Sequence, residues 1–156
     1  MLRGLLTIPP HRVWRKRGDC REGVEIAMKE FSVRTEQQEE LVDITSKVQG
    51  VVGQSKIEDG MCVVFIPHTT AGVTINENAD PTVKGDIIKG LKVIPSSGYL
   101  HSEGNSPAHI KASIIGSSVT IFIEKGKLAL GVWQGVYFTE FDGPRQRSVW
   151  VKVGKL

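Results

Sequence analysis

Met61-Cys62-Val63-Val64-Phe65-Ile66 is a continuous apolar run bounded by Gly60 and Pro67. The run is short and contains β-branched residues, which is typical of a buried strand rather than of a helix. Strands that are covered on both faces have such uninterrupted apolar sequences. We therefore predict that residues 61–66 form a central strand of a sheet and are buried on both sides.

Further strands are expected on both sides of this run. Apolar and polar residues alternate at 30–34 and 72–76, and residues 39–45 form another candidate strand. Strand-like segments then follow one another near the C-terminus, at 119–123, 128–133, 136–141 and 148–153. Strands joined by short turns pair antiparallel. We predict an α+β, mainly β fold: an antiparallel, jelly-roll-like β-sandwich with two or three short helices on one side.

Two helices have recognisable ends. Thr45 or Ser46 is expected to cap a helix that ends near Gly53, and Asp80-Pro81 is a strong start for a helix that runs toward Pro95. Residues 95–107 are rich in Ser, Gly, Asn and Pro and are predicted to form a loop. Residues 110–115 fit one or two helical turns without a clear boundary.

The 156 residues are 40% hydrophobic and 24% charged, a composition typical of one globular domain. The formal net charge of +3 resides entirely in residues 1–27, because residues 28–156 contain 14 basic and 14 acidic groups. We expect 1–27 to be a flexible extension or a start-site artefact. A transit peptide, or a tail ordered by a neighbouring subunit, is the alternative. Residues 28–156 are then a single domain whose balanced charge disfavours nucleic-acid binding.

The sequence has no apolar run of the roughly 18–20 residues that a membrane-spanning helix requires, so no membrane partner is expected. It contains only two cysteines, Cys20 and Cys62, and no secretory segment. This usage predicts a reduced, cytoplasmic protein. Cys62 lies inside the apolar run and is expected to be a buried thiol without a chemical role.

Polar residues gather in three segments, 67–78, 100–109 and 133–147. His68, His101 and His109 can together bind a divalent metal, with Glu77, Glu103 or water completing the shell. The alternative is that the three are loop histidines without a metal. His68 and Glu77 are also candidates for general acid–base catalysis.

The third segment contains two arginines. Arg145 and Arg147 can hold a phosphate or carboxylate in bidentate fashion. The alternative for Arg145 is a structural ion pair with Glu140 or Asp142. Trp133 is expected in the core or at a subunit interface.

Three motifs carry a family resemblance: 68–72 continuing to Asn76-Glu77, 105–113, and 130–135 continuing to 140–145. In these motifs the sequence resembles the YjbQ family, also known as uncharacterised protein family 47 and as secondary thiamine-phosphate synthase. The resemblance covers about residues 28–156. It implies a compact antiparallel sandwich, a homotrimer and a weak thiamine-phosphate-forming activity with an unsettled physiological role.

With the resemblance, the sequence predicts a low-activity enzyme that handles phosphorylated small molecules at a His/Asn/Glu pocket. The alternative is a module that binds a small anion or a metal without turnover. The predicted metal is zinc or magnesium, on His68, His101 and His109. The predicted catalytic residues are His68, Asn76, Glu77 and His109. The residues predicted to bind substrate or phosphate are Thr69, Thr70, Asn105, Gln134 and Arg145.

Overall fold

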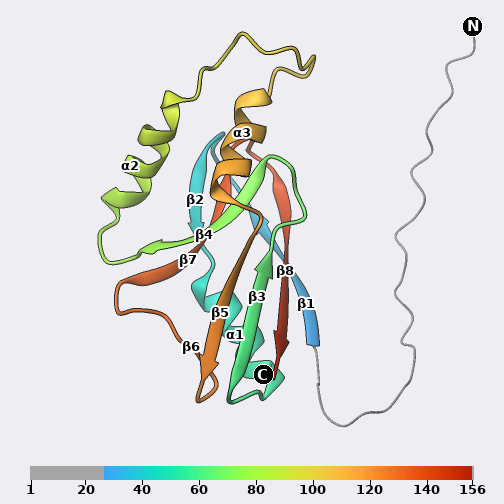
Figure 1. Cartoon of the computed structure of the whole chain (residues 1–156), viewed down its shortest axis with the longest axis vertical. Coiled ribbons are helices and arrows are strands. Elements are labelled where there is room, and N and C mark those ends of the chain that lie inside the picture. The colour runs from blue at the N-terminus through green and yellow to red at the C-terminus, as the bar shows by residue number, and fades with distance from the viewer. Residues whose placement is uncertain (1–26, 156) are drawn as a thin grey trace, which may run out of the picture.

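The computed structural model describes residues 27–155, which form two antiparallel sheets and four helical segments (Figure 1). The predicted N-terminal extension lies outside the described residues, apart from Ala27. The α+β, mainly β class predicted from the sequence is confirmed. None of the helices within residues 27–155 has the length and hydropathy needed to cross a membrane.

The larger sheet has five strands in the order β1-β8-β3-β5-β6. All of its pairings are antiparallel, and β3 lies at its centre between β8 and β5. The central position predicted for the apolar run is therefore confirmed. The strands are β1 Ala27–Arg34, β8 Gln146–Gly154, β3 Gly60–Phe65, β5 Ser118–Glu124 and β6 Lys127–Leu128.

The smaller sheet has three strands in the order β2-β7-β4. These strands are β2 Glu40–Asp43, β7 Gln134–Glu140 and β4 Ala71–Glu77. The two long strands pair along their whole length, from Ala71 opposite Glu140 to Glu77 opposite Gln134. This register determines which ends of β4 and β7 meet, and hence which polar residues are neighbours.

The helical segments are α1 Thr45–Ser55, α2 Thr82–Gly90, the 3-10 turn η1 Leu91–Val93 and α3 Ser106–Ile115. In α1, the buried side chains of Val48, Val51 and Val52 recur at helical spacing. Figure 1 shows α2 standing away from the sheets, with a long connection leading from η1 to α3. None of the residues of α2 is fully buried.

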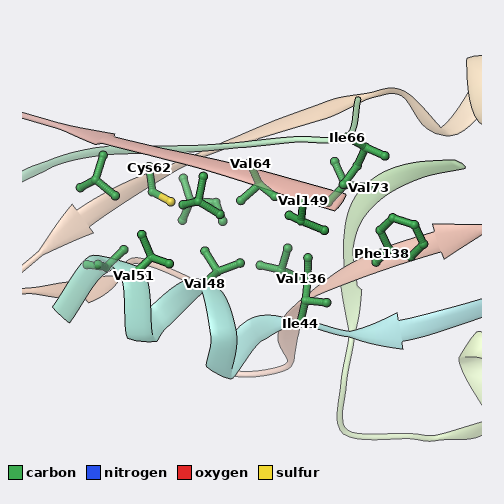
Figure 2. Close-up of a cluster of buried hydrophobic side chains, with 14 of the residues drawn as sticks. Ile44, Val48, Val51, Cys62, Val64, Ile66, Val73, Val136, Phe138 and Val149 are labelled. Atoms are coloured by element: carbon green, nitrogen blue, oxygen red, sulfur yellow. The ribbon is translucent and has the colours of Figure 1, made fainter. Parts of the chain in front are cut away.

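The main core lies between the inner face of the five-stranded sheet on one side and α1 with the smaller sheet on the other (Figure 2). The five-stranded sheet contributes Cys62 and Val64 of β3, and β7 contributes Val136 and Phe138. Burial raises the pKa of the Cys62 thiol to about 12, and the expectation that Cys62 is a buried thiol is confirmed.

Several sequence predictions were wrong in detail. Residues 61–66 are not covered on both sides, because Phe65 is 39% exposed while Cys62 and Val64 are buried. Of the predicted strand 128–133, only Leu128 lies in a strand, at the end of β6, and α1 begins after Ile44 without a side-chain cap. The ambiguous segment 110–115 is the C-terminal part of α3, which already begins at Ser106.

Gly72 of β4 is in close contact with the segment that leads from α3 into β5. A β-carbon at Gly72 would meet the carbonyl oxygen of Gly116 and the side chain of Ile115. The same carbonyl accepts a hydrogen bond from the N–H of Val73, at 3.0 Å. β4 can therefore approach α3 only because residue 72 has no side chain.

We predict that Gly72→Ala lowers the free energy of unfolding by about 1–3 kcal/mol, because backbone must move to admit the methyl group. The matched control is Gly85→Ala in α2, where a β-carbon meets nothing within 4 Å. That control should stabilise the protein by about 0.5–1 kcal/mol through helix propensity. Urea unfolding of both variants measures the difference, and equal effects would contradict the close approach.

Candidate functional site

A buried ion pair joins the end of β7 to the start of β8. The guanidinium of Arg147 donates from Nε to Oε2 of Glu140 at 2.7 Å and from Nη2 to Oε1 at 2.5 Å. The Glu140 side chain is completely buried and that of Arg147 is 9% exposed. Two parallel hydrogen bonds of this kind are the strongest arrangement available to an arginine and a carboxylate.

The remaining hydrogen-bonding capacity of this pair connects it to its surroundings. Oε1 of Glu140 accepts the backbone N–H groups of Phe141 and Asp142, at 3.1 and 3.0 Å. Nη2 of Arg147 also donates to Oγ1 of Thr70, at 2.9 Å. A buried charged pair is tolerated when its polar atoms are satisfied in this way. The pair thus fixes the β7–β8 turn and the residues before β4 relative to each other.

We predict that Arg147→Met lowers the free energy of unfolding by about 3–5 kcal/mol, because Glu140 would remain buried without its partner. The matched control is Arg145→Met, which removes an arginine whose side chain is 53% exposed. Loss of such an exposed pair should cost less than about 1 kcal/mol. Chemical denaturation measures both values, and a small effect of Arg147→Met would contradict the importance assigned to the pair.

A cleft of about 1000 Å³ lies next to this turn, between α2 with η1 on one side and α3 on the other. Ile88 and Pro107 give its walls an apolar part, and Phe141 lies in the wall beside Asp142. The volume reaches the upper end of the range that small-molecule sites occupy. The cleft is therefore large enough to hold a metabolite of two ring systems or one ring with phosphates.

Two predicted residues, Asn105 and Asp142, lie in the wall of this cleft. Nδ2 of Asn105 donates to Oδ2 of Asp142 at 3.2 Å, and Nη2 of Arg145 donates to the same oxygen at 2.8 Å. Because only the amide nitrogen can donate to a carboxylate, Oδ1 of Asn105 is the remaining atom, and it is buried without a hydrogen-bond partner among residues 27–155. The structural alternative for Arg145, an ion pair with Asp142, is the arrangement observed.

Lys111 of α3 and Glu39, between β1 and β2, form a second ion pair in the cleft wall. Nζ of Lys111 lies 2.5 Å from Oε1 of Glu39. The exposed fractions of the two side chains are 6% and 22%. Lysine is rarely buried unless it is paired, and here Glu39 supplies the pairing charge at the edge of the cleft.

His68 lies beside the buried pair but does not line the cleft. Its Nε2 accepts the backbone N–H of Ser148 at 2.9 Å, at a point where β8 is still paired with β1 on one edge but β3 has ended on the other. The neutral ring therefore carries its proton on Nδ1. Burial, and next the charge of Arg147, hold the pKa of His68 below its ordinary value.

This arrangement suits His68 to donate a hydrogen bond from Nδ1. Nε2 is already used as an acceptor, and a metal on Nδ1 would remove the only ring proton, whereas metal-bound imidazoles keep one N–H. The predicted general-base and metal-ligand roles of His68 would both require its ring to leave Ser148.

We predict that ¹⁵N spectra of the imidazole show the Nδ1–H tautomer for His68 and a pKa below 6.5. Because the pKa in the folded state is lowered, the unfolded chain binds the proton first as the pH falls. His68 should therefore contribute full stability above about pH 6.5 and lose it as the pH falls below that value. A His68 that protonates above pH 6.5 would contradict the assignment.

The other two histidines lie together. The rings of His101 and His109 are 5.4 Å apart between centroids, in an edge-to-face arrangement, and His101 is 3.7 Å from Glu103. Within residues 27–155, no three His, Cys, Asp or Glu side chains are placed so that they could hold a metal ion. The structure thus brings two of the three histidines together, and the metal stays a prediction.

Asn76, Glu77 and Gln134 lie at the opposite end of the small sheet from the buried pair. Glu77 is paired with Gln134, whereas Glu140 is opposite Ala71 at the other end of β4. Seven residues of extended strand separate these ends by roughly 20 Å. One protomer therefore does not bring Asn76 and Glu77 to the cleft.

The two threonines differ. Thr70 is buried and its Oγ1 accepts a hydrogen bond from Arg147, and its contact with a phosphate stays a prediction. Thr69 is exposed. The sequence predicted no role for Glu39 or Lys111. Lys111 lies in the 105–113 motif, which could have drawn attention to it, whereas no pattern near Glu39 indicates a site.

The fold and these contacts define a mainly β protein with two antiparallel sheets and a polar cleft at the end of β7. The chain belongs to the YjbQ/UPF0047 family, since the family model described as "UPF0047 protein YjbQ-like" matches residues 29–155.

Relatives from distant organisms agree with this assignment. UPF0047 protein MJ1081 of Methanocaldococcus jannaschii is 54% identical over 79% of this chain and 91% of its own length. UPF0047 protein YugU of Bacillus subtilis is 44% identical over 81% and 98%.

Solved structures of the family have the same fold. A YjbQ/UPF0047 family protein from Clostridium acetobutylicum matches with a TM-score of 0.79 and 60% identity, over 80% of this chain and 98% of its own. A YbjQ-like protein of unknown function, SSO2532 from Sulfolobus solfataricus, matches with a TM-score of 0.82 and 32% identity, over 86% of this chain and 100% of its own.

Proposed function

We propose that the protein is a low-activity enzyme of the thiamine-phosphate synthase type that handles phosphorylated small molecules at the cleft beside the Glu140–Arg147 pair. In this reaction the ring nitrogen of a thiazole phosphate forms a bond to the methylene carbon of a pyrimidinylmethyl diphosphate. The bond from that carbon to the bridging oxygen breaks, and diphosphate leaves with the electron pair.

The observation that supports this function is the meeting of two motifs in one cleft. Asn105 comes from the 105–113 motif and Asp142 from the 140–145 motif, and their side chains are hydrogen-bonded in the cleft wall. A concave site with a few convergent polar groups is the usual form of a small-molecule site. The chain needs to supply mainly orientation and charge, because negative charge develops on the departing diphosphate.

The predicted catalytic residues differ in how close they lie to the cleft. His109 lies on α3 next to the cleft-lining residue Ala108. Asn76 and Glu77 lie at the far end of β4 from the cleft of their own protomer. They can act at a cleft only if that cleft belongs to a neighbouring subunit. A metal on the predicted ligands His68, His101 and His109 would supply positive charge to the leaving diphosphate.

A homotrimer is part of the proposal, and the outer face of the five-stranded sheet supports self-association. Phe65 and Phe122 are 39% and 60% exposed on this face, and the ring of Trp150 lies 5.8 Å from that of Phe65. Contiguous exposed apolar side chains mark interaction surfaces. Light scattering should give a mass of three chains.

We predict that the protein forms thiamine phosphate from the two phosphorylated precursors and that Asn105→Ala lowers the rate at least about tenfold, through loss of orientation in the cleft. The matched control is Gln54→Ala, which removes an exposed amide on α1. Product analysis by chromatography measures both rates, with thermal unfolding to confirm that each variant is folded.

Two results would contradict the proposed enzyme. One is the absence of product with the wild-type protein, and the other is an unchanged rate with Asn105→Ala. If the wild-type protein binds a phosphorylated precursor without converting it, the alternative from the sequence, a non-catalytic anion-binding module, is the better description.

A further inference from the structure

Both arginines that the sequence assigned to a phosphate are already bound to carboxylates. Arg147 is buried against Glu140, and Arg145 is bound to Asp142. Arg147 could reach a ligand only by abandoning a charge-assisted hydrogen bond, and Arg145 is not among the residues that line the cleft. A phosphate in the cleft therefore needs a different cation.

Two lysines line the cleft: Lys92 is exposed to solvent, whereas Lys111 is nearly buried and has unused hydrogen-bonding capacity. An ammonium group has three N–H donors, and Nζ of Lys111 has one hydrogen-bond partner among the described residues, Oε1 of Glu39. The Lys111 side chain is only 6% exposed, so water has little access to the other two donors. Burial of a charge with so few partners is costly, and further acceptors would lower that cost.

Glu39 is placed so that it covers Lys111 and can leave. It lies in the segment that joins β1 to β2, and the three residues before it, 36–38, are exposed. Its own side chain is 22% exposed. Rotation of this side chain into solvent would uncover the ammonium of Lys111 without any change in α3.

We propose that Lys111 is the anion-binding residue of the cleft and that the Glu39 carboxylate occupies the position of the ligand's phosphate when the cleft is empty. The ligand class is a phosphorylated small molecule whose phosphate or diphosphate displaces Glu39. A diphosphate has more charge and more acceptor oxygens than one carboxylate, so it can take the donors that Glu39 leaves unused. The inference rests on the cleft of the proposed function but not on its reaction.

The test is calorimetric titration of the full chain with inorganic diphosphate at fixed ionic strength. Glu39→Gln should bind about three- to tenfold more tightly than wild type, because the competing negative charge is gone. Lys111→Met should bind at least about tenfold more weakly, as expected for loss of a charge-assisted contact. The matched control is Lys89→Met, an exposed lysine of α2 that does not line the cleft; it should change the affinity less than about twofold.

Thermal unfolding keeps the test decisive where Lys111→Met does not fold. Glu39→Gln leaves Lys111 without its carboxylate, so this variant should unfold at a lower temperature than wild type. Diphosphate should raise the unfolding temperature of Glu39→Gln by more than it raises that of wild type. If the pair only ties α3 to the β1–β2 segment, Glu39→Gln lowers stability with no gain in affinity. That result, or the failure of wild type to bind diphosphate, would overturn the inference.

The outcome is separate from that of the proposed function. Diphosphate binding with the expected order of variants, but no thiamine phosphate formed, would support the anion site and reject the reaction. Thiamine phosphate formation that is unaffected in Glu39→Gln and Lys111→Met would support the reaction and reject Lys111 as the anion-binding residue.

Discussion

The bidentate contact between Glu140 and Arg147 is the constraint on which the rest of the structure depends. It lies where β7 ends and β8 begins, and Glu140 has no exposed surface. A charge in that position is tolerated only with its partner and its hydrogen bonds in place. The pair therefore allows one conformation of the β7–β8 turn, in which Phe141 packs on Ala108 and Ala112 of α3.

The geometry of the cleft follows from that turn. Because Oε1 of Glu140 holds the N–H of Asp142, the Asp142 side chain is delivered to Asn105 and Arg145 at the cleft wall. The arginines then stabilise the turn beside the cleft, and Lys111 remains as the buried cation of the cleft wall with free donors. In the proposed site, structural support and ligand binding are thus assigned to different basic residues, as expected when a site is built on rigid support.

The sequence predicted the strands well and the site only partly. Periodicity and turn residues place β1, β3, β4 and β8 because they report local structure. The sequence does not show that the outer face of β3 is uncovered by this chain. A run that is apolar on both faces has the same pattern whether its outer face packs against the same chain or against a different one. Nor does it show that Glu77 and His68 lie at opposite ends of β4. Residues only a few positions apart in the sequence lie far apart in space when the chain between them is an extended strand. The Lys111–Glu39 contact joins residues 72 positions apart, and local patterns have no access to such pairs.

Amide hydrogen exchange at Asp142 tests most directly whether the buried pair holds the cleft wall. Asp142 lies outside the β-strands, and within the described part of the chain its N–H is bonded only to the Glu140 carboxylate. Opening of that bond should require breaking the pair, and we expect Asp142 to exchange as slowly as the core residues Phe138 and Val149. Exchange of Asp142 at the rate of an exposed turn would show that the wall is not fixed by the pair and would contradict this account.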